Sequence, residues 1–145
     1  MIAVDTNILV YAHRRDSEWH ESAARCMKDL AEGSATWGLP WPCIHEFLAI
    51  TTHDRIFNPP SSLKRAIEQV DVWMASPSIL LLTESTHHWQ SLVPMLNLAR
   101  IRGPMVHDAR IAALCLQHGV HELWTADRDF SRFKEVVVRN PLIAA

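Results

Sequence analysis

The sequence has few of the residues that organise secreted, metal-finger or membrane proteins. Its three cysteines, Cys26, Cys43 and Cys115, lie far apart and form no C-x-x-C motif, so neither a disulfide framework nor a zinc site is predicted. No apolar run is long enough to cross a membrane, and no basic leader precedes the first residues. We therefore expect a cytoplasmic protein with reduced thiols.

Positive charge is also scarce. The chain has 14 Lys and Arg against 16 Asp and Glu, a formal net charge of −2, so its surface as a whole cannot hold nucleic acid by bulk electrostatics. Any nucleic-acid site must be local. Arginine outnumbers lysine 11 to 3, which suits bidentate phosphate contacts, although a GC-rich genome produces the same bias.

What the sequence does contain is enough apolar material for one core. With 145 residues, of which 48% are hydrophobic, it fits a single domain spanning residues 1–145. Short apolar runs predict five buried strands. These runs are residues 2–4, 36–39, 79–82, 123–125 and 136–138.

Between the predicted strands lie segments with helical spacing, most clearly residues 23–31 and 63–74. Residues 89–96 keep the same spacing, but Pro94 should kink or shorten that helix. The expected helix boundaries are marked by Ser17, Pro42, Ser61, Gly33 and Gly119. Alternating strands and helices without a hairpin signal predict an α/β domain, with a parallel sheet covered by helices on both faces.

Acidic residues follow two predicted strands and begin two predicted helices. Asp5 follows the first strand, and Asp127 and Asp129 follow the fourth. Open parallel sheets bind ligands outside the carboxyl ends of their strands, so these acids can share one crevice. Glu46 lies one turn into the helix after the second strand, and Asp108 precedes the apolar stripe of a later helix.

An isolated acid in such a place is usually a cap or turn residue, but four from separate segments point to a shared role. If the carboxylates converge, their repulsion is unfavourable unless a divalent cation neutralises it. All-oxygen ligands favour Mg²⁺ or Mn²⁺, and either ion can activate water for phosphodiester hydrolysis. The chain has no G-x-S-x-G, Walker or H-E-x-x-H motif for other common hydrolytic mechanisms.

Several segments together resemble a PIN domain of the VapC toxin type. They are VDTNIL at residues 4–9, Glu46, VHDA at 106–109, WTADRDF at 124–130 and RNPL at 139–142. The resemblance extends over the whole chain. It implies a metal-dependent endoribonuclease that acts on RNA, forms a homodimer, and is inhibited by a cognate VapB-like antitoxin whose tail enters the active-site groove.

The resemblance places Asp5, Glu46, Asp108 and Asp127 at the family's four acidic positions, as catalytic residues that hold Mg²⁺ or Mn²⁺. Asp5 and Asp108 are the first choice for direct ligands, while Glu46 and Asp127 bind the metal or its water. Asp129 either helps to hold a second ion or caps the turn at residue 130, and we favour the cap.

Polar and basic neighbours of these acids suggest supporting roles. Thr6, Asn7 and Thr125 are expected to fix the carboxylates by hydrogen bonds, although Thr125 is nearly as well explained as an ordinary strand residue. Trp73, Trp89 and Trp124 fit apolar stripes or strands and are assigned to the core. The candidate RNA contacts are Arg14, Arg15, Arg102, Arg128, His107 and Trp41.

Three other functions fit the sequence less well. A housekeeping RNA-processing PIN nuclease is less consistent with a compact chain, and an antitoxin gene directly upstream would exclude it. A catalytically silent PIN domain that binds RNA or protein would be expected to lack some of the acids. An HAD-like phosphatase needs a second acid two residues after the first, where this chain has Asn7.

Overall fold

The computed structural model describes residues 1–143, and within them five strands form one sheet. Their bounds lie within two residues of the apolar runs named above, so the predicted set of strands is confirmed. The strands are β1 (Ile2–Val4), β2 (Trp37–Pro40), β3 (Ile79–Leu82), β4 (Glu122–Trp124) and β5 (Val138–Arg139).

All strand pairs are parallel, in the order β3-β2-β1-β4-β5. The chain moves outward from β1 through β2 to β3, then returns to the other side of β1 to form β4 and β5. The strand order therefore reverses between β1 and β4, where Ile2 pairs with Glu122 and Val4 with Trp124. At such a reversal the connections leave in opposite directions and open a crevice at the carboxyl ends of the strands.

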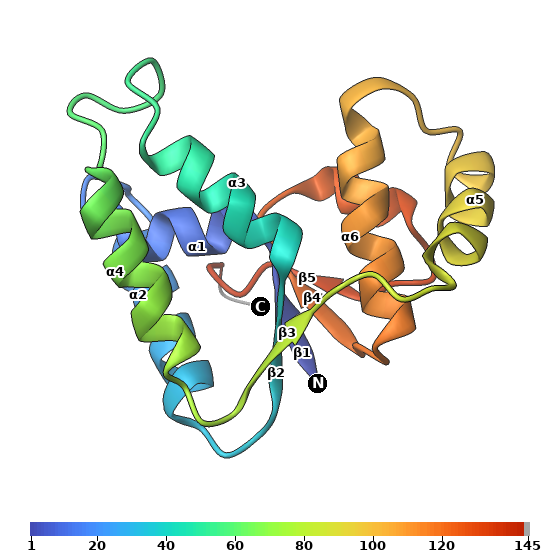
Figure 1. Cartoon of the computed structure of the whole chain (residues 1–145), viewed down its shortest axis with the longest axis horizontal. Coiled ribbons are helices and arrows are strands. Elements are labelled where there is room, and N and C mark those ends of the chain that lie inside the picture. Colours follow the sequence, from blue (N-terminus) through green and yellow to red (C-terminus); the bar gives the residue numbers. More distant parts are fainter. Residues whose placement is uncertain (144–145) are drawn as a thin grey trace.

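Helices cover both faces of the sheet, as predicted. Figure 1 shows α1 to α4 on one side of the strands and α5 and α6 on the other. The helices are α1 (Thr6–His13), α2 (His20–Glu32), α3 (Trp41–Thr51), α4 (Leu63–Met74), α5 (His88–Leu98) and α6 (Val106–Gln117), with short 3-10 turns η1 (Gly103–Met105) and η2 (Arg128–Arg132). No helix within residues 1–143 is long and apolar enough to span a membrane.

The core lies between the sheet and these helices. Ala3 and Val4 of the central strand are fully buried, because helices cover both sides of β1. Gly38 of β2 packs directly against β3: a side chain at this position would approach Leu82 Cδ1 to 2.9 Å.

Three of the predicted helix boundaries are confirmed. Pro42 lies in the first turn of α3, where its missing N–H costs no helix hydrogen bond. Gly33 is the residue at which α2 ends. Gly119 follows the end of α6 with φ of +66°, a backbone conformation that a side chain would strain.

The two predicted serine caps are not helix caps. α4 is capped by Ser62, whose Oγ accepts from the Arg65 N–H at 3.2 Å, because the helix begins one residue later than expected. Ser61 instead faces the side chain of His13. Ser17 Oγ accepts from the N–H of Trp19 at 3.1 Å, so it stabilises the turn before α2.

The outer helix α5 is not shortened at Pro94, and its tryptophan is exposed. It continues through Pro94, whose exposed position lets water compensate for the lost backbone hydrogen bond. Trp89 is 66% exposed, so its assignment to the core is wrong. The residues of α5 that pack inward are Leu92 and Met95, and Trp89 lies before them in the first turn. Trp73 is buried, as predicted.

Candidate active site

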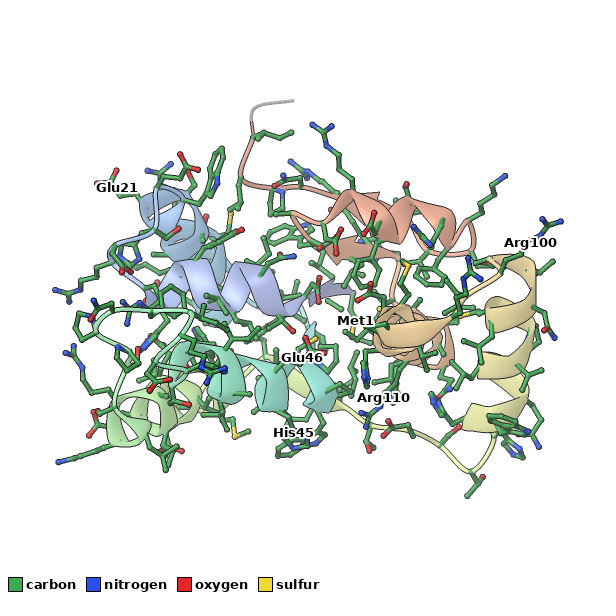
Figure 2. The ribbon with its side chains drawn as sticks, turned by 90° about the horizontal axis from the view of Figure 1, so that it is seen from above. Met1, Glu21, His45, Glu46, Arg100 and Arg110 are labelled. Atoms are coloured by element: carbon green, nitrogen blue, oxygen red, sulfur yellow. The ribbon has the colours of Figure 1, made fainter. Side chains whose placement is uncertain are left out.

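Four carboxylates line one cleft of about 310 Å³. Asp5 follows β1, Asp127 follows β4, Glu46 lies in α3 and Asp108 lies in the first turn of α6. The cleft is therefore at the reversal of strand order between β1 and β4. In Figure 2, which views the molecule from above, Glu46 points toward the middle of the molecule and the neighbouring His45 points outward.

Asp5 is held in place by hydrogen bonds to both carboxylate oxygens. Its Oδ1 accepts from the Thr6 N–H at 2.8 Å, so the side chain caps α1. Its Oδ2 accepts from Thr125 Oγ1 at 2.8 Å and from Asn7 Nδ2 at 3.3 Å. The thiol of Cys43 also approaches Oδ1, at 3.8 Å. A buried acid with this many partners has a fixed orientation.

The cleft disfavours negative charge. The pKa of Asp5 is raised to about 6, mainly by burial; the hydrogen bonds from Thr125 and Thr6 oppose this rise, and the nearby charges of Glu46 and Asp108 add to it. The pKa of Asp108 is also raised to about 6, first by burial and then by Asp127, Glu46 and Asp129. Each ionised acid therefore makes ionisation of the others less favourable, and a bound cation would relieve that repulsion.

Asn7 and Thr125 join the ends of β1 and β4. Asn7 Nδ2 donates to Thr125 Oγ1 at 3.0 Å, and Asn7 Oδ1 accepts from the N–H of Ala126 at 3.0 Å. Thr125 Oγ1 accepts from the N–H of Asp127 at 3.0 Å and donates to Asp5. One network thus positions carboxylates from two segments that are far apart in sequence.

A separate hydrogen bond positions Glu46. Thr6 Oγ1 donates to Glu46 Oε2 at 3.1 Å. The hydrogen bonds expected of Thr6, Asn7 and Thr125 are therefore present, which favours a supporting role for Thr125 over an ordinary strand residue. Their contribution to catalysis stays a prediction.

The cap assigned to Asp129 belongs to Asp127. Asp127 Oδ1 accepts from the N–H of Asp129 at 2.8 Å, because η2 begins at Arg128 and the capping position falls one residue before it. The Asp129 side chain is exposed and lies 3.9 Å from Arg132 Nη2. Asp129 is outside the lining of the cleft, although its charge contributes to the raised pKa of Asp108.

The donor chemistry of the cleft fits a hard divalent cation. Within residues 1–143, no group of three Asp, Glu, His or Cys side chains is close enough to ligate one ion directly. Mg²⁺, however, retains several waters and is commonly bound through one or two carboxylates. The oxygen donors of the cleft, with two carboxyls whose pKa values are raised, are consistent with such a site.

Two further hollows adjoin the acidic cleft. One, of about 400 Å³, shares Glu46 and Asp108 with it and is also lined by His107. The other, of about 440 Å³, shares Asp127 and is also lined by Arg128. Two of the candidate RNA contacts therefore lie next to the carboxylates, on residues that flank the cleft.

The other candidate RNA contacts lie elsewhere. Arg14 and Arg15 line a separate pocket beyond the end of α1. Arg102 is exposed just before η1, outside the lining of the cleft and its two adjoining hollows. Trp41 packs partly against the core, with its ring centroid 6.0 Å from that of His45, and it is also outside the lining of the cleft.

Sequence reasoning missed several residues of the cleft. Tyr11 and Ile50 line it, and Cys43 approaches Asp5. Tyr11 is four residues after Asn7, and Ile50 is four residues after Glu46, so each shares a helix face with a residue that had been identified. That spacing is the signal that would have found them.

Comparison with known protein families gives a match over nearly the whole chain. A model described as the PIN domain matches residues 2–136. The chain is 33% identical over 142 residues to VapC ribonuclease Mb2897 of Mycobacterium bovis, covering 98% of this chain and 96% of that protein. It is 28% identical over 137 residues to ribonuclease VapC48 of Mycobacterium tuberculosis, covering 94% of each.

Solved structures give the same fold at lower identity. VapBC2 from Rickettsia felis, bound to a DNA fragment from its promoter, aligns with a TM-score of 0.70 and 17% identity over 97% of this chain and 98% of that one. VapC20 of Mycobacterium tuberculosis, described as a toxin that cleaves the sarcin-ricin loop, aligns with a TM-score of 0.68 and 14% identity over 90% and 93%.

Proposed function

The chain belongs to the PIN-domain family, and we propose that it is a VapC-type endoribonuclease, the toxin of a toxin–antitoxin pair. It hydrolyses phosphodiester bonds of cytoplasmic RNA with Mg²⁺ or Mn²⁺ held by Asp5, Glu46, Asp108 and Asp127. The full-length similarity to curated VapC ribonucleases supports the nuclease activity.

The observation that carries the metal-dependent mechanism is the convergence of four carboxylates from four segments on one cleft. Burial and mutual repulsion raise the pKa of Asp5 and Asp108 to about 6. At neutral pH this cleft is an anionic, partly buried site that gains free energy by binding a cation. The phosphate of RNA would be repelled from the same site unless a cation were present.

The chain's own residues hold and orient the acids. Asp5 and Asp108 are the first choice for direct ligands, with Glu46 and Asp127 binding the metal or its water. Two contacts of Asp5 are long, 3.3 Å from Asn7 and 3.8 Å from Cys43, and these are the contacts that a cation can most easily replace. When bound, the cation lowers the pKa of a coordinated water and stabilises charge on the phosphoryl group.

The direct test is cleavage of total cellular RNA by the purified protein, with Mg²⁺, Mn²⁺ or chelator, beside an Asp5→Asn variant. We expect discrete cleavage products with either ion, and none with chelator or with the variant. Mapping the new ends would identify the RNA and the position of the cut. Cleavage that persisted in excess chelator would refute the metal-dependent mechanism.

The proposed partner is a VapB-like antitoxin. A guanidinium can replace the charge of the cation and bond two carboxylates at once, so we expect an antitoxin arginine to enter the acidic cleft. Inhibition should then weaken as Mg²⁺ or Mn²⁺ rises, and when that arginine is changed to alanine. Full inhibition after both the metal titration and deletion of the antitoxin tail would show that the inhibitor binds elsewhere.

We also propose a homodimer. Leu63 and Ile67 form an exposed apolar ridge along α4, with side chains 60% and 45% exposed, and Ile56 in the preceding loop is 53% exposed. A symmetric pair could bury this ridge against its copy. Light scattering should show a dimer that Leu63→Glu with Ile67→Glu converts to monomer. A wild-type mass of 16.5 kDa at micromolar concentration would contradict the dimer.

A further inference from the structure

A basic pocket of about 380 Å³ lies at the far end of α1 from the acidic cleft. Figure 1 shows the start of α4 near the end of α1 that points away from the sheet. The pocket is lined by side chains from these two segments: His13, Arg14, Arg15, Ser61, Ser62 and Arg65. Asp16 is the one acidic residue of its lining within residues 1–143.

Arg14 lies at one side of the pocket and is held in place by several contacts. Arg14 Nε and Nη2 donate to the two carboxylate oxygens of Asp16 at 2.9 and 2.7 Å, and Nη1 donates to Ser61 Oγ at 3.3 Å. Its guanidinium also lies 4.2 Å from the ring centroid of Phe57. The Arg14 side chain is only 12% exposed, so it is held in one orientation.

Two other arginines remain available for a ligand. Arg15 and Arg65 are exposed, and neither forms an ion pair with any residue in 1–143. Three arginines against one aspartate leave the pocket positively charged. The positive charge is also felt by His13, whose pKa is lowered first by burial and then by Arg14 and Arg65.

The pocket has a fixed position relative to the carboxylates. Asp5 caps one end of α1 and Arg14 ends the other, nine residues later, which corresponds to about 13 Å along the helix axis. A strand of a few nucleotides is long enough to cover this distance. One helix therefore spaces the two charged sites at a distance that a short single strand can cover.

We propose that this pocket binds a backbone phosphate of the RNA, a few nucleotides from the bond that is cut. Arg15 and Arg65 contact the phosphate, while Arg14 and His13 shape the pocket. The identity of the ligand rests on the proposed ribonuclease function. RNA is favoured over an acidic peptide because its strand must cross the cleft at the other end of the same helix, and the charged residues that line that cleft within residues 1–143 are all acidic.

The test uses two double variants. The pocket pair carries both Arg15→Gln and Arg65→Gln. The matched pair carries both Arg25→Gln and Arg100→Gln, and so removes two exposed arginines outside the pocket. Figure 2 shows Arg100 at the outer end of α5. The probe is a fluorescent uridine oligomer of about 12 nucleotides, bound to chains that also carry Asp5→Asn so that it stays intact. We expect the pocket pair to weaken RNA binding roughly tenfold and to lower the slope of log affinity against log salt concentration by about one phosphate contact. We expect the matched pair to weaken RNA binding less than twofold.

Cleavage measurements separate this inference from the proposed function. With Asp5 intact, the pocket pair should raise KM and leave kcat unchanged, because it removes binding far from the reacting bond. Equal weakening of RNA binding by both pairs would overturn the proposed phosphate site. So would a pocket pair that weakens binding of a polyglutamate peptide but leaves RNA binding unchanged. A chain that cleaved no RNA yet bound the oligomer in a pocket-dependent way would refute the nuclease and retain the pocket.

Discussion

The two ends of α1 differ in charge and in how their polar side chains are paired. At its start, Asp5 is buried and accepts hydrogen bonds from neutral donors, so its negative charge has no cationic partner within residues 1–143. At its end, Arg14 is neutralised by Asp16, but Arg15 and Arg65 are left free. The cleft is thus suited to a cation, whereas the pocket is suited to an anion.

The helix itself favours this arrangement. Its N-terminus carries a partial positive charge that stabilises the Asp5 carboxylate, and its C-terminus carries a partial negative charge that suits Arg14. A chain with a net negative charge can thus still offer a site for an anion, because opposite charges are separated along one short helix.

The largest expected effect is on the acidic end. Asp5→Asn should reduce RNA cleavage by roughly 1000-fold while the chain remains folded, since the amide keeps the shape but removes the charge that holds the cation. Asp71→Asn, on the exposed surface of α4, is the matched control and should leave the rate unchanged. Initial rates measured in Mn²⁺ decide the matter, and an Asp5→Asn rate within tenfold of wild type would show that Asp5 is not a metal ligand.

The two ends of α1 should contribute with opposite sign to the pH dependence of the stability of the metal-free protein. Because the pKa of Asp5 is raised from 3.8 to about 6, the native state retains a proton that the unfolded state loses, and stability falls as pH rises from about 4 to about 6. The loss is about 2–3 kcal/mol. Arg14 lowers the pKa of Asp16, so that pair adds stability above pH 3.8 and loses it in stronger acid.

Urea unfolding in chelator at several pH values measures this dependence. Asp5→Asn should reduce the fall in stability between about pH 4 and 6, because the amide does not titrate; the part that remains comes from Asp108, whose pKa is also raised to about 6. Saturating Mn²⁺ should raise the stability of the wild type near pH 7 more than that of the variant. A wild-type stability that rose over this pH range in chelator would contradict the pKa given to Asp5.

A smaller effect is expected from the network that joins the strand ends. Asn7→Ala removes the contacts to Asp5, Thr125 and Ala126, which should lower cleavage about 10–100-fold and stability by about 1–3 kcal/mol. Asn97→Ala, at an exposed position of α5, is the control and should change neither quantity. If Asn7→Ala behaved like the control, the carboxylates would be positioned without this network.

Much of the fold and of the acidic cleft could be predicted from the sequence. The spacing of apolar residues and the order of strands and helices place Asp5 and Asp127 after buried parallel strands. The carboxyl ends of parallel strands lie at one edge of a sheet. Glu46 could be placed from Pro42 at the start of its helix, and Asp108 from the apolar stripe that follows it. These inferences need only local patterns and the rules of sheet topology.

Other features depend on tertiary packing that local patterns do not determine. The exposure of Trp89 follows from where α5 meets the core, and the cap at Asp127 follows from where η2 begins. The basic pocket was also hidden, because Arg15 and Arg65 are separated by fifty residues and meet only when α4 packs near the end of α1. The sequence showed Arg15 as a candidate, but not its partner.

A titration of the metal-free protein with Mn²⁺, followed by nuclear magnetic resonance, tests the central claim most directly. The unpaired electrons of Mn²⁺ broaden the signals of nearby amides, so the position of the ion can be read along α1. We predict selective broadening around Asp5, Glu46, Asp108 and Asp127, with much weaker effects at Arg14 and Arg65. Uniform broadening, or broadening centred away from the acidic cleft, would contradict the assignment of this cleft as the metal site.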